Sequence, residues 1–481
     1  MRERVLAGAL SLLVASCSLA PRYQRPEPPV AAEWPGGAPR PSAEETAAAD
    51  LGWRDVIGDA RLQAVVELAL LNNRDLRVAS LNVELARARY GIQRSALLPE
   101  VDGTASYVRN RTPLDQSVTG RPFTSAQWSV GAGIPAWELD LFGRVRSLKD
   151  AALESWLATQ EAQRGARLSL VAETADLYLT TRALDEELDL AGRTLELVRA
   201  SHDLTRRRYE AGLASELDLR TAEVQVQTAR VNLAAITQQR AQAEDALVLL
   251  VGQPLPASLP PPAPLDDSGI VMDLPVGLPS QVLLRRPDVL AAEHALKSAN
   301  ASIGAARAAF FPTISLTAFG GYSSSEVNDL FDRASGLWSF MPRISVPIFT
   351  AGRNVAGLEA SQAQRDIAVA RYEQAIQAAF RDVADALASR DQIETQVQAG
   401  KLRVEAGERR YRLAELRFNK GVDSSLSVII AQQDLYASQH LLVLSRLARL
   451  ENLVNLYRAL GGGWLERTGQ RENGAGPAAG S

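Results

Sequence analysis

Side chains that could carry out chemistry are few and scattered in this sequence of 481 residues. Cys17 is the only cysteine, so the chain can form neither an internal disulfide nor a cysteine-rich metal site. Metal-binding spacing such as H-E-x-x-H, a G-x-S-x-G nucleophile elbow and a Walker loop are all missing. The three histidines, His202, His294 and His440, are scattered along predicted helices and lack the spacing of metal ligands. We therefore expect no enzyme, no cofactor and no metal site.

The position of Cys17 indicates another use for its thiol. Two arginines precede an apolar segment (5–14) that is too short to span a membrane, as in a secretory signal peptide. The sequence VASC, ending at Cys17, resembles the lipobox of bacterial lipoproteins. That resemblance implies cleavage after residue 16 and a lipid anchor on Cys17, and Ser18 in place of aspartate favours the outer membrane. The alternative is an ordinary signal peptide with an incidental cysteine.

Composition limits the partners of the chain. A formal net charge of −4 and a pI near 5.7 give no electrostatic case for nucleic acid. Beyond the signal, no apolar run is long enough for a spanning helix, so a deeper membrane role would have to use β-strands.

The sequence repeats itself. Gly212 matches Gly421 at an offset of 209 positions (421 minus 212), and the same offset pairs Ser215 with Ser424. A proline-rich segment joins the copies. We therefore predict a signal peptide (1–16), a lipidated extended strap (17–60), a first repeat (61–251), a proline-rich linker (252–280), a second repeat (281–464) and a flexible tail (465–481).

Each repeat has the same predicted order of elements. A helix (75–97 or 288–309) precedes two strands that alternate apolar residues with small or polar ones. The predicted strands are 102–111, 126–137, 313–323 and 337–349. Proline-free stretches that follow predict very long helices, such as 146–210. Leu184, Leu188, Ala191, Leu195 and Val198 have coiled-coil spacing, which fits either an antiparallel coiled coil or a wall of helices in a helical barrel.

Four strands cannot close a barrel, yet open edges invite aggregation and lipid-exposed strands must form a closed barrel. Three copies of the chain would supply twelve strands. The sequence also resembles a known family. The segments WELDLFGRVRSLKDAALE, ANASIGAARAAFFPTISL, VPIFTAGR and ALGGGW are similar to the outer-membrane factors of tripartite efflux pumps, over nearly the whole stretch from Cys17 to Trp464.

The resemblance implies a mixed α/β membrane protein in the bacterial outer membrane. It would be a homotrimer in which a 12-stranded β-barrel joins a 12-helix periplasmic α-barrel with an equatorial collar. It would conduct drugs and other small amphipathic molecules passively. Its implied partners are a periplasmic adaptor protein, an inner-membrane transporter of the resistance-nodulation-division class and outer-membrane lipid.

Two turns are candidate docking sites. In YEAGLAS and FNKGVDS, Gly212 and Gly421 can take the left-handed position that ends a helix. Ser215 or Ser424 then caps the next helix, with Asp218 completing a capping box in the first copy. The resemblance implies that six such hairpins dock the adaptor, and the alternative is two ordinary turns between helices.

The resemblance also implies a periplasmic gate. Where relatives carry a ring of aspartates one turn after a leucine, this chain has Leu426 followed by Ile430. These two share one helix face, and three copies of each would form stacked apolar rings that gate by dewetting. Asp423, Glu216 and Asp218 would make the mouth electronegative. Alternatively, the face of Leu426 and Ile430 is buried in the helix wall.

Two other functions are weighed against this one. A structural periplasmic lipoprotein, such as a coiled-coil tether, would lack the two alternating strand pairs. An exporter of proteins or of copper and silver ions is a variant within the family. Transport of copper or silver along thioether groups would require methionines. The chain has three, of which Met1 is in the signal, so drugs and other small amphipathic molecules are the better expectation.

Overall fold

The computed structural model describes residues 18–35, 48–118, 120–265, 269–271, 274–277 and 279–469. The predicted signal peptide and Cys17 lie outside the described residues. Among those described, no helix combines the length and apolarity needed to cross a membrane. The chain divides into two compact units. The first has Leu81–Gln160, Ala291–Glu373 and residues 18–27, and the second has Pro28–Ser80, Glu161–Leu290 and the segment from Gln374 onward.

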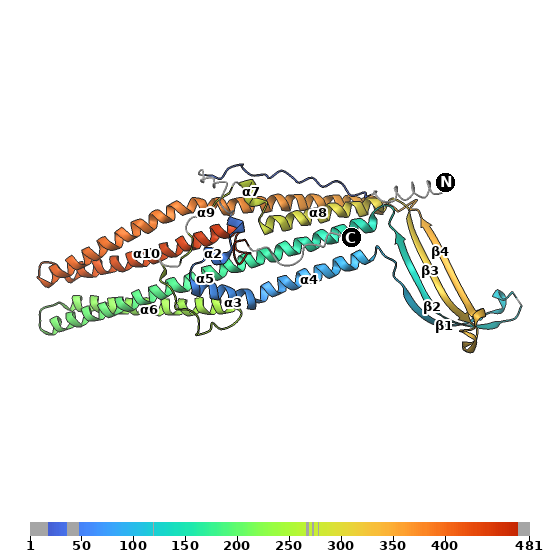
Figure 1. Cartoon of the computed structure of the whole chain (residues 1–481). Helices are drawn as coiled ribbons and strands as arrows, with labels where there is room; N and C mark the ends of the chain where they lie inside the picture. Colours follow the sequence, from blue (N-terminus) through green and yellow to red (C-terminus); the bar gives the residue numbers. More distant parts are fainter. Residues whose placement is uncertain are drawn as a thin grey trace. The chain divides into compact units, whose positions relative to one another are not determined.

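The first unit contains an antiparallel sheet in the order β1-β2-β3-β4 (Figure 1). Its strands are β1 (Asp102–Thr112), β2 (Phe123–Leu139), β3 (Thr313–Ser324) and β4 (Gly336–Ser345). The register places Gly131 of β2 opposite Gly321 of β3. A Cβ at Gly321 would lie 2.2 Å from the carbonyl oxygen of Val130, so only glycine permits this close pairing.

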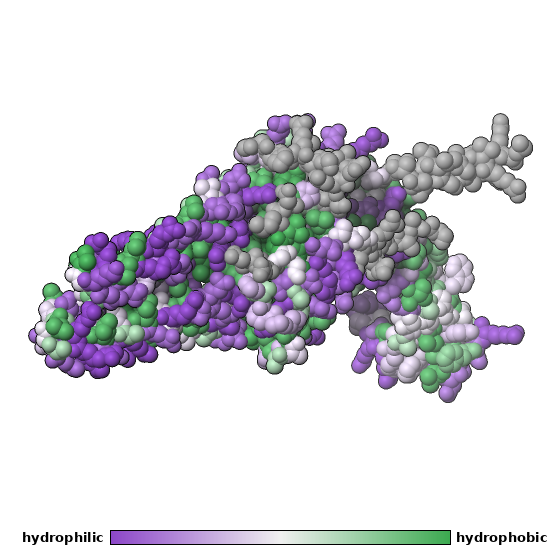
Figure 2. Space-filling model, turned by 60° about the vertical axis from the view of Figure 1, so that its left-hand side comes forward, coloured by the Kyte–Doolittle hydropathy of each residue, from purple (hydrophilic) through white to green (hydrophobic). Residues whose placement is uncertain are grey.

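Two prolines shape the strand ends and the register. The β2–β3 register shifts between Ile134 and Trp137, on either side of Pro135, because proline has no N–H to give the ladder. The predicted strand 337–349 is too long, since β4 ends at Ser345, two residues before Pro347. On β4, Trp338, Phe340 and Ile344 are exposed, and hydrophobic and near-neutral residues cover much of the sheet region in Figure 2.

Helices flank the sheet in sequence. They are α4 (Arg74–Ser95), α5 (Arg144–Glu210), α8 (Pro287–Ala308) and α9 (Arg353–Asn419). In the first unit, residues 18–27 lie along α8 in an extended conformation. Arg25 forms an ion pair of 2.9 Å with Glu293, whose side chain is almost fully buried. The Tyr23 hydroxyl donates to the same carboxylate at 3.1 Å.

The second unit is built on two long helical hairpins that lie side by side with their turns at one end (Figure 1). One joins α5 to α6 (Glu216–Val251), and the other joins α9 to α10 (Ser425–Ala459). The predicted coiled-coil seam is present between α5 and α6, because Leu195 and Val198 bury against Val226 and Ala229. In the described part of the chain, the remaining helices are shorter: η1 (Ala48–Asp50), α2 (Trp53–Val56), α3 (Ala60–Asn72), η2 (Leu114–Gln116), α7 (Pro279–Leu283), η4 (Val327–Asp329) and η5 (Arg333–Ser335).

The predicted boundaries at the two ends of the chain need revision. Part of the predicted strap is helical, since α2 and the start of α3 fall within it. The predicted tail is ordered through Gly469, because the Trp53 amide donates to the Leu465 carbonyl at 3.0 Å. Thr468 also donates to the Asp55 carboxylate at 2.6 Å. These bonds hold the segment that follows α10 against α2.

Candidate functional site

The candidate site is the end of the second unit where the two hairpins turn. Gly212 and Gly421 have φ of 75° and 74°. The Gly212 amide donates to Tyr209 and the Leu213 amide to Arg208, at 2.9 and 2.7 Å. Gly421 and the next residue make the same two bonds, so both helices end in a Schellman motif. The sequence repeat therefore produces two turns of matching geometry.

The restart of the helices differs between the copies. Ser215 is the N-cap of α6 and forms a full capping box with Asp218. Ser424 occupies the N-cap position of α10, but its side chain makes no capping hydrogen bond, so the prediction that it caps this helix is wrong. The residue equivalent to Asp218 is Ser427, so the second copy also lacks the carboxylate that would complete a capping box.

Asp218 has a second contact that the sequence did not predict. Its carboxylate also accepts from the Ser425 hydroxyl at 2.8 Å, which ties the first turn of α6 to the first turn of α10. Hydrogen bonds from Ser215 and then Ser425 lower the pKa of Asp218 below its usual value. Asp218 is thus occupied as an acceptor between the hairpins.

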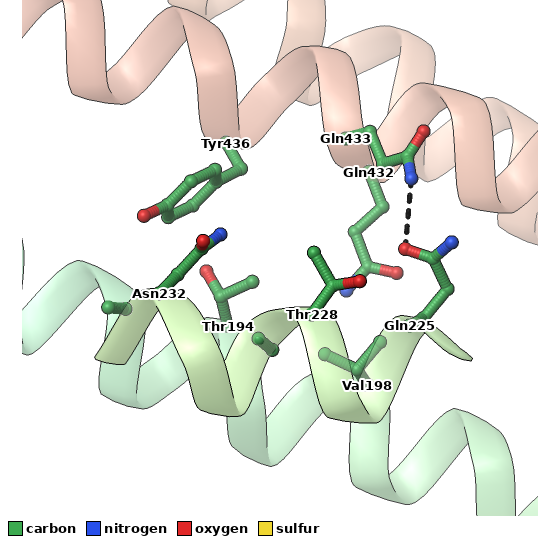
Figure 3. A pocket seen from close by; sticks show the side chains of 10 residues that line it. Thr194, Val198, Gln225, Thr228, Asn232, Gln432, Gln433 and Tyr436 are labelled. Carbon is green, nitrogen blue, oxygen red and sulfur yellow. Dashed lines mark hydrogen bonds between the residues drawn. The ribbon is translucent and has the colours of Figure 1, made fainter. Parts of the chain in front are cut away.

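Two further contacts join the hairpins near this tie. Gln433 of α10 donates to the side-chain oxygen of Gln225 of α6 at 2.9 Å (Figure 3). The guanidinium of Arg208 lies over the ring of Phe418, 4.7 Å from its centroid. Such contacts fix how the α5–α6 hairpin lies against the α9–α10 hairpin.

The other two acids predicted at the mouth are also paired within the chain. Asp423 accepts from the Arg417 guanidinium at 2.6 and 3.1 Å, and this bond lowers the pKa of Asp423. Glu216 lies 3.5 Å from Arg220. The arginines reduce the negative charge that these carboxylates present, an effect that the prediction from acids alone omitted.

Leu426 and Ile430 lie on successive turns at the start of α10. Their exposed fractions are 55% and 41%, so the single chain leaves about half of each side chain uncovered. Val428 and Ile429, on other faces of the same helix, line a cavity of 180 Å³ between the two hairpins. The tie between Asp218 and Ser425 is at the wall of that cavity.

Exposed apolar side chains cluster at the turns, and the sequence analysis missed them. Leu213 and Val422 directly follow the turn glycines and are 79% and 61% exposed. Leu217 is 76% exposed one turn later. Figure 2 shows hydrophobic residues among polar ones at this end of the helices. The repeat could have revealed them, since Leu213 and Val422 are equivalent positions.

A smaller cavity of 100 Å³ lies farther from the turns (Figure 3). Tyr436 and Gln432 project from α10 toward Asn232 and Thr228 of α6, while Thr194 comes from α5. The lining is a mixture of amides, hydroxyls and small apolar groups. None of these side chains is a strong nucleophile or a charged metal ligand.

Ionisable groups also meet between α5 and α10. Burial raises the pKa of Glu187, which lies 3.2 Å from the ring of His440. Burial, followed by the nearby charge of Glu451, raises the pKa of Asp176 to about 7. The described part of the chain contains no group of three or more His, Cys, Asp or Glu side chains that could hold a metal ion.

The profile of the outer membrane efflux protein family matches residues 65–253 and 278–462, which is most of the chain. The chain belongs to this family. It is 47% identical to the probable efflux pump outer membrane protein TtgC of Pseudomonas putida, over 98% of both sequences. It is 43% identical to the outer membrane protein OprJ of Pseudomonas aeruginosa, over 96% of both.

Solved structures agree with these relatives. A membrane protein from P. aeruginosa superposes with a TM-score of 0.86 at 42% identity, covering 92% of this chain and all of the other. The open state of the MtrE outer membrane channel of Neisseria gonorrhoeae gives 0.86 at 39% identity, covering 94% and 100%. This family member is therefore an outer-membrane efflux channel with a long periplasmic portion, and it is not an enzyme.

Proposed function

We propose that this outer-membrane efflux channel works as a homotrimer with a 12-stranded β-barrel and a 12-helix periplasmic α-barrel. Support comes from the sheet, whose strands β1 and β4 are the edges. They run in opposite directions, so β4 of one copy can pair antiparallel with β1 of the next. Three copies supply an even number of strands, which is usual for bacterial barrels.

This assembly can be tested by disulfide trapping across the sheet edges. One cysteine would replace Ser106 on β1 and one would replace Ser339 on β4. A ladder ending at a covalent trimer on a denaturing gel is expected, and either single variant serves as a control. A monomer, or a ladder that continues past three chains, would disprove the closed trimer.

The partners in this proposal are a periplasmic adaptor and an inner-membrane transporter of the resistance-nodulation-division class. The adaptor docks at six hairpin turns, around Gly212, Ser215, Gly421 and Ser424. The observation that supports docking is the pair of exposed apolar side chains that follow the glycines, Leu213 and Val422. Exposed apolar groups rimmed by polar ones are a common feature of protein contact sites.

The substrates we propose are antibiotics, organic solvents and other small amphipathic molecules. Relatives are named as an antibiotic efflux pump protein, 47% identical, and as a toluene efflux pump protein, also 47% identical. Expression of the channel with its pump in a strain lacking efflux should restore growth in both classes of compound. Failure with both, with the protein present in the outer membrane, would refute this substrate range.

The gate in this proposal is a double apolar ring formed by Leu426 and Ile430. Their exposure in the single chain leaves them free to face a pore, and it also leaves them free to face a neighbouring subunit. Asp423, Glu216 and Asp218 surround the mouth with much of their charge neutralised or engaged. We therefore expect divalent cations to block this channel less than they block relatives with an aspartate ring.

The anchor in this proposal is a lipid on Cys17, which lies outside the described residues. The described residues that follow it, from Ser18, extend along α8 in the first unit. Intact mass should show a chain that begins at Cys17 and carries acyl groups. A free thiol, or a different first residue, would disprove lipidation.

A further inference from the structure

A polar cavity with a volume of 600 Å³ lies in the second unit, in the region of α3 and the first turns of α4. Its wall also includes part of α5 and the segment after α10, and all of these belong to one compact unit. Nothing in the channel function described above uses this cavity. Its size is suited to a small organic molecule.

The wall of this cavity carries four arginines and two glutamates. Both glutamates are engaged by one arginine, since Arg54 lies 2.7 Å from Glu466 and 2.9 Å from Glu67. The other three arginines are Arg74, Arg77 and Arg167. Since the two carboxylates balance only part of this charge, the cavity wall is net positive.

The side chains of Arg74, Arg77 and Arg167 make no ion pair or hydrogen bond to any residue in the described ranges. Arg74 and Arg77 sit three residues apart on the first turns of α4, so their side chains share one face. The Nε of Arg167 is buried and has no acceptor.

We propose that this cavity binds an anion carrying two or more carboxylate or phosphate groups. Guanidinium groups are the usual partners of these oxyanions because their donors form a planar fork. Arg77 and Arg167 line the cavity from different helices, α4 and α5, and in this proposal one ligand bridges them. A single charge would leave one of these guanidinium groups unpaired, which is why the ligand is multivalent.

The test is calorimetric titration of the purified full-length protein with pyrophosphate and with citrate at low salt. Saturable binding of at least one is expected, and trehalose, an uncharged probe, should not bind. If pyrophosphate binds more tightly than citrate, the ligand is a phosphate compound, and the reverse order indicates a carboxylate. Fluorescence of Trp53, which lines the cavity, gives a second readout.

Arg77→Gln and Arg167→Gln should each weaken binding by at least about tenfold, because each removes a charge-assisted contact. Arg403→Gln is the matched control, since Arg403 is exposed on α9 and does not line the cavity. Arg167→Lys keeps the charge but loses the fork, and we expect intermediate affinity. Arg77 is exposed, so its variant should fold even if the Arg167 variants do not.

Two results would overturn the proposal. One is the absence of saturable binding of both anions to the wild type. The other is an equal loss of binding in Arg403→Gln, which would show that general surface charge attracts the anions. If acidic side chains of a neighbouring subunit fill the cavity instead, neither anion will bind, and Arg77→Gln will lower the thermal stability of the oligomer.

Discussion

The bond between Ser425 and Asp218 gives a direct test of whether contacts between the two hairpins keep the proposed gate closed. Ser425→Ala removes the hydrogen bond from this serine to Asp218 of α6 and leaves the capping box of Asp218 intact. Ser215→Ala is the matched control, because it removes the cap of α6 and leaves the contact with Ser425. The two variants therefore separate loss of the tie from loss of helix stability.

The size of the effect follows from the geometry. A hydrogen bond to a charged acceptor contributes about 1.5–3 kcal/mol, and partial exposure of Ser425 and Asp218 reduces this to about 1 kcal/mol. If three subunits open together, the closed state loses about 3 kcal/mol, which raises the ratio of open to closed channels by about 150-fold. Ser215→Ala should lower the stability of α6 by a similar free energy, about 1 kcal/mol per subunit. It should leave the ratio of open to closed channels within about fivefold of the wild type.

Planar bilayer recording of open probability measures this difference, and vancomycin sensitivity reports it in cells. We expect Ser425→Ala channels to open at voltages where the wild type stays closed. Because the pKa of Asp218 is lowered, the tie is present above about pH 4 and is lost only as pH falls through that lowered pKa. Wild-type gating through this tie should thus be constant from about pH 5 to 8. Unchanged opening in Ser425→Ala, or equal opening in Ser215→Ala, would refute the assignment.

Three further predictions concern other parts of the second unit. Leu426→Ala combined with Ile430→Ala should raise single-channel conductance and vancomycin sensitivity, and unchanged conductance would remove both residues from the gate. Leu213→Ser combined with Val422→Ser should abolish drug resistance while outer-membrane insertion is retained, whereas full resistance would rule out docking through these side chains. Asp176→Asn should stabilise the protein at neutral pH by a few kcal/mol at most, because the pKa near 7 means that the folded state loses stability as pH rises from about 4 to 7. Thermal melts at pH 5 and 7.5 check this, with the exposed Asp189→Asn as control, and an undiminished pH dependence in Asp176→Asn would contradict it.

Much of the architecture could be predicted because both repeats carry the same pattern of apolar and polar residues. The alternation along 126–137 predicts a strand, and the structure has β2 over a slightly longer range. The 4,3 spacing that ends at Val198 predicts a seam, and its last two positions, Leu195 and Val198, are buried against α6. Such periodic patterns report which face of an element is apolar, and that property belongs to the element alone.

The contacts between hairpins could not be predicted in the same way. The sequence pattern predicts Asp218 as a capping residue. Its bond to Ser425 exists only because α6 packs against α10. Arg417 and Asp423 are six residues apart on either side of a turn, so their pairing depends on the turn geometry. Local pattern gives the helix ends but carries little information on which polar groups meet across two helices.

The divergence between the two repeats suggests which hairpin moves. Both turns have matching backbone geometry, but α6 is capped by its own Ser215 and Asp218, whereas α10 has no side-chain cap. The start of α10 is held by Asp218 through Ser425 and by the pairing of Arg417 with Asp423. If the tie to Asp218 breaks, α6 keeps its cap while α10 loses a contact at its first turn. We therefore expect the α9–α10 hairpin, which carries Leu426 and Ile430, to be displaced when the channel opens. Spin labels at Val422 and Leu213 would measure this, with Ser425→Ala broadening the Val422 distance distribution between subunits and leaving that of Leu213 unchanged.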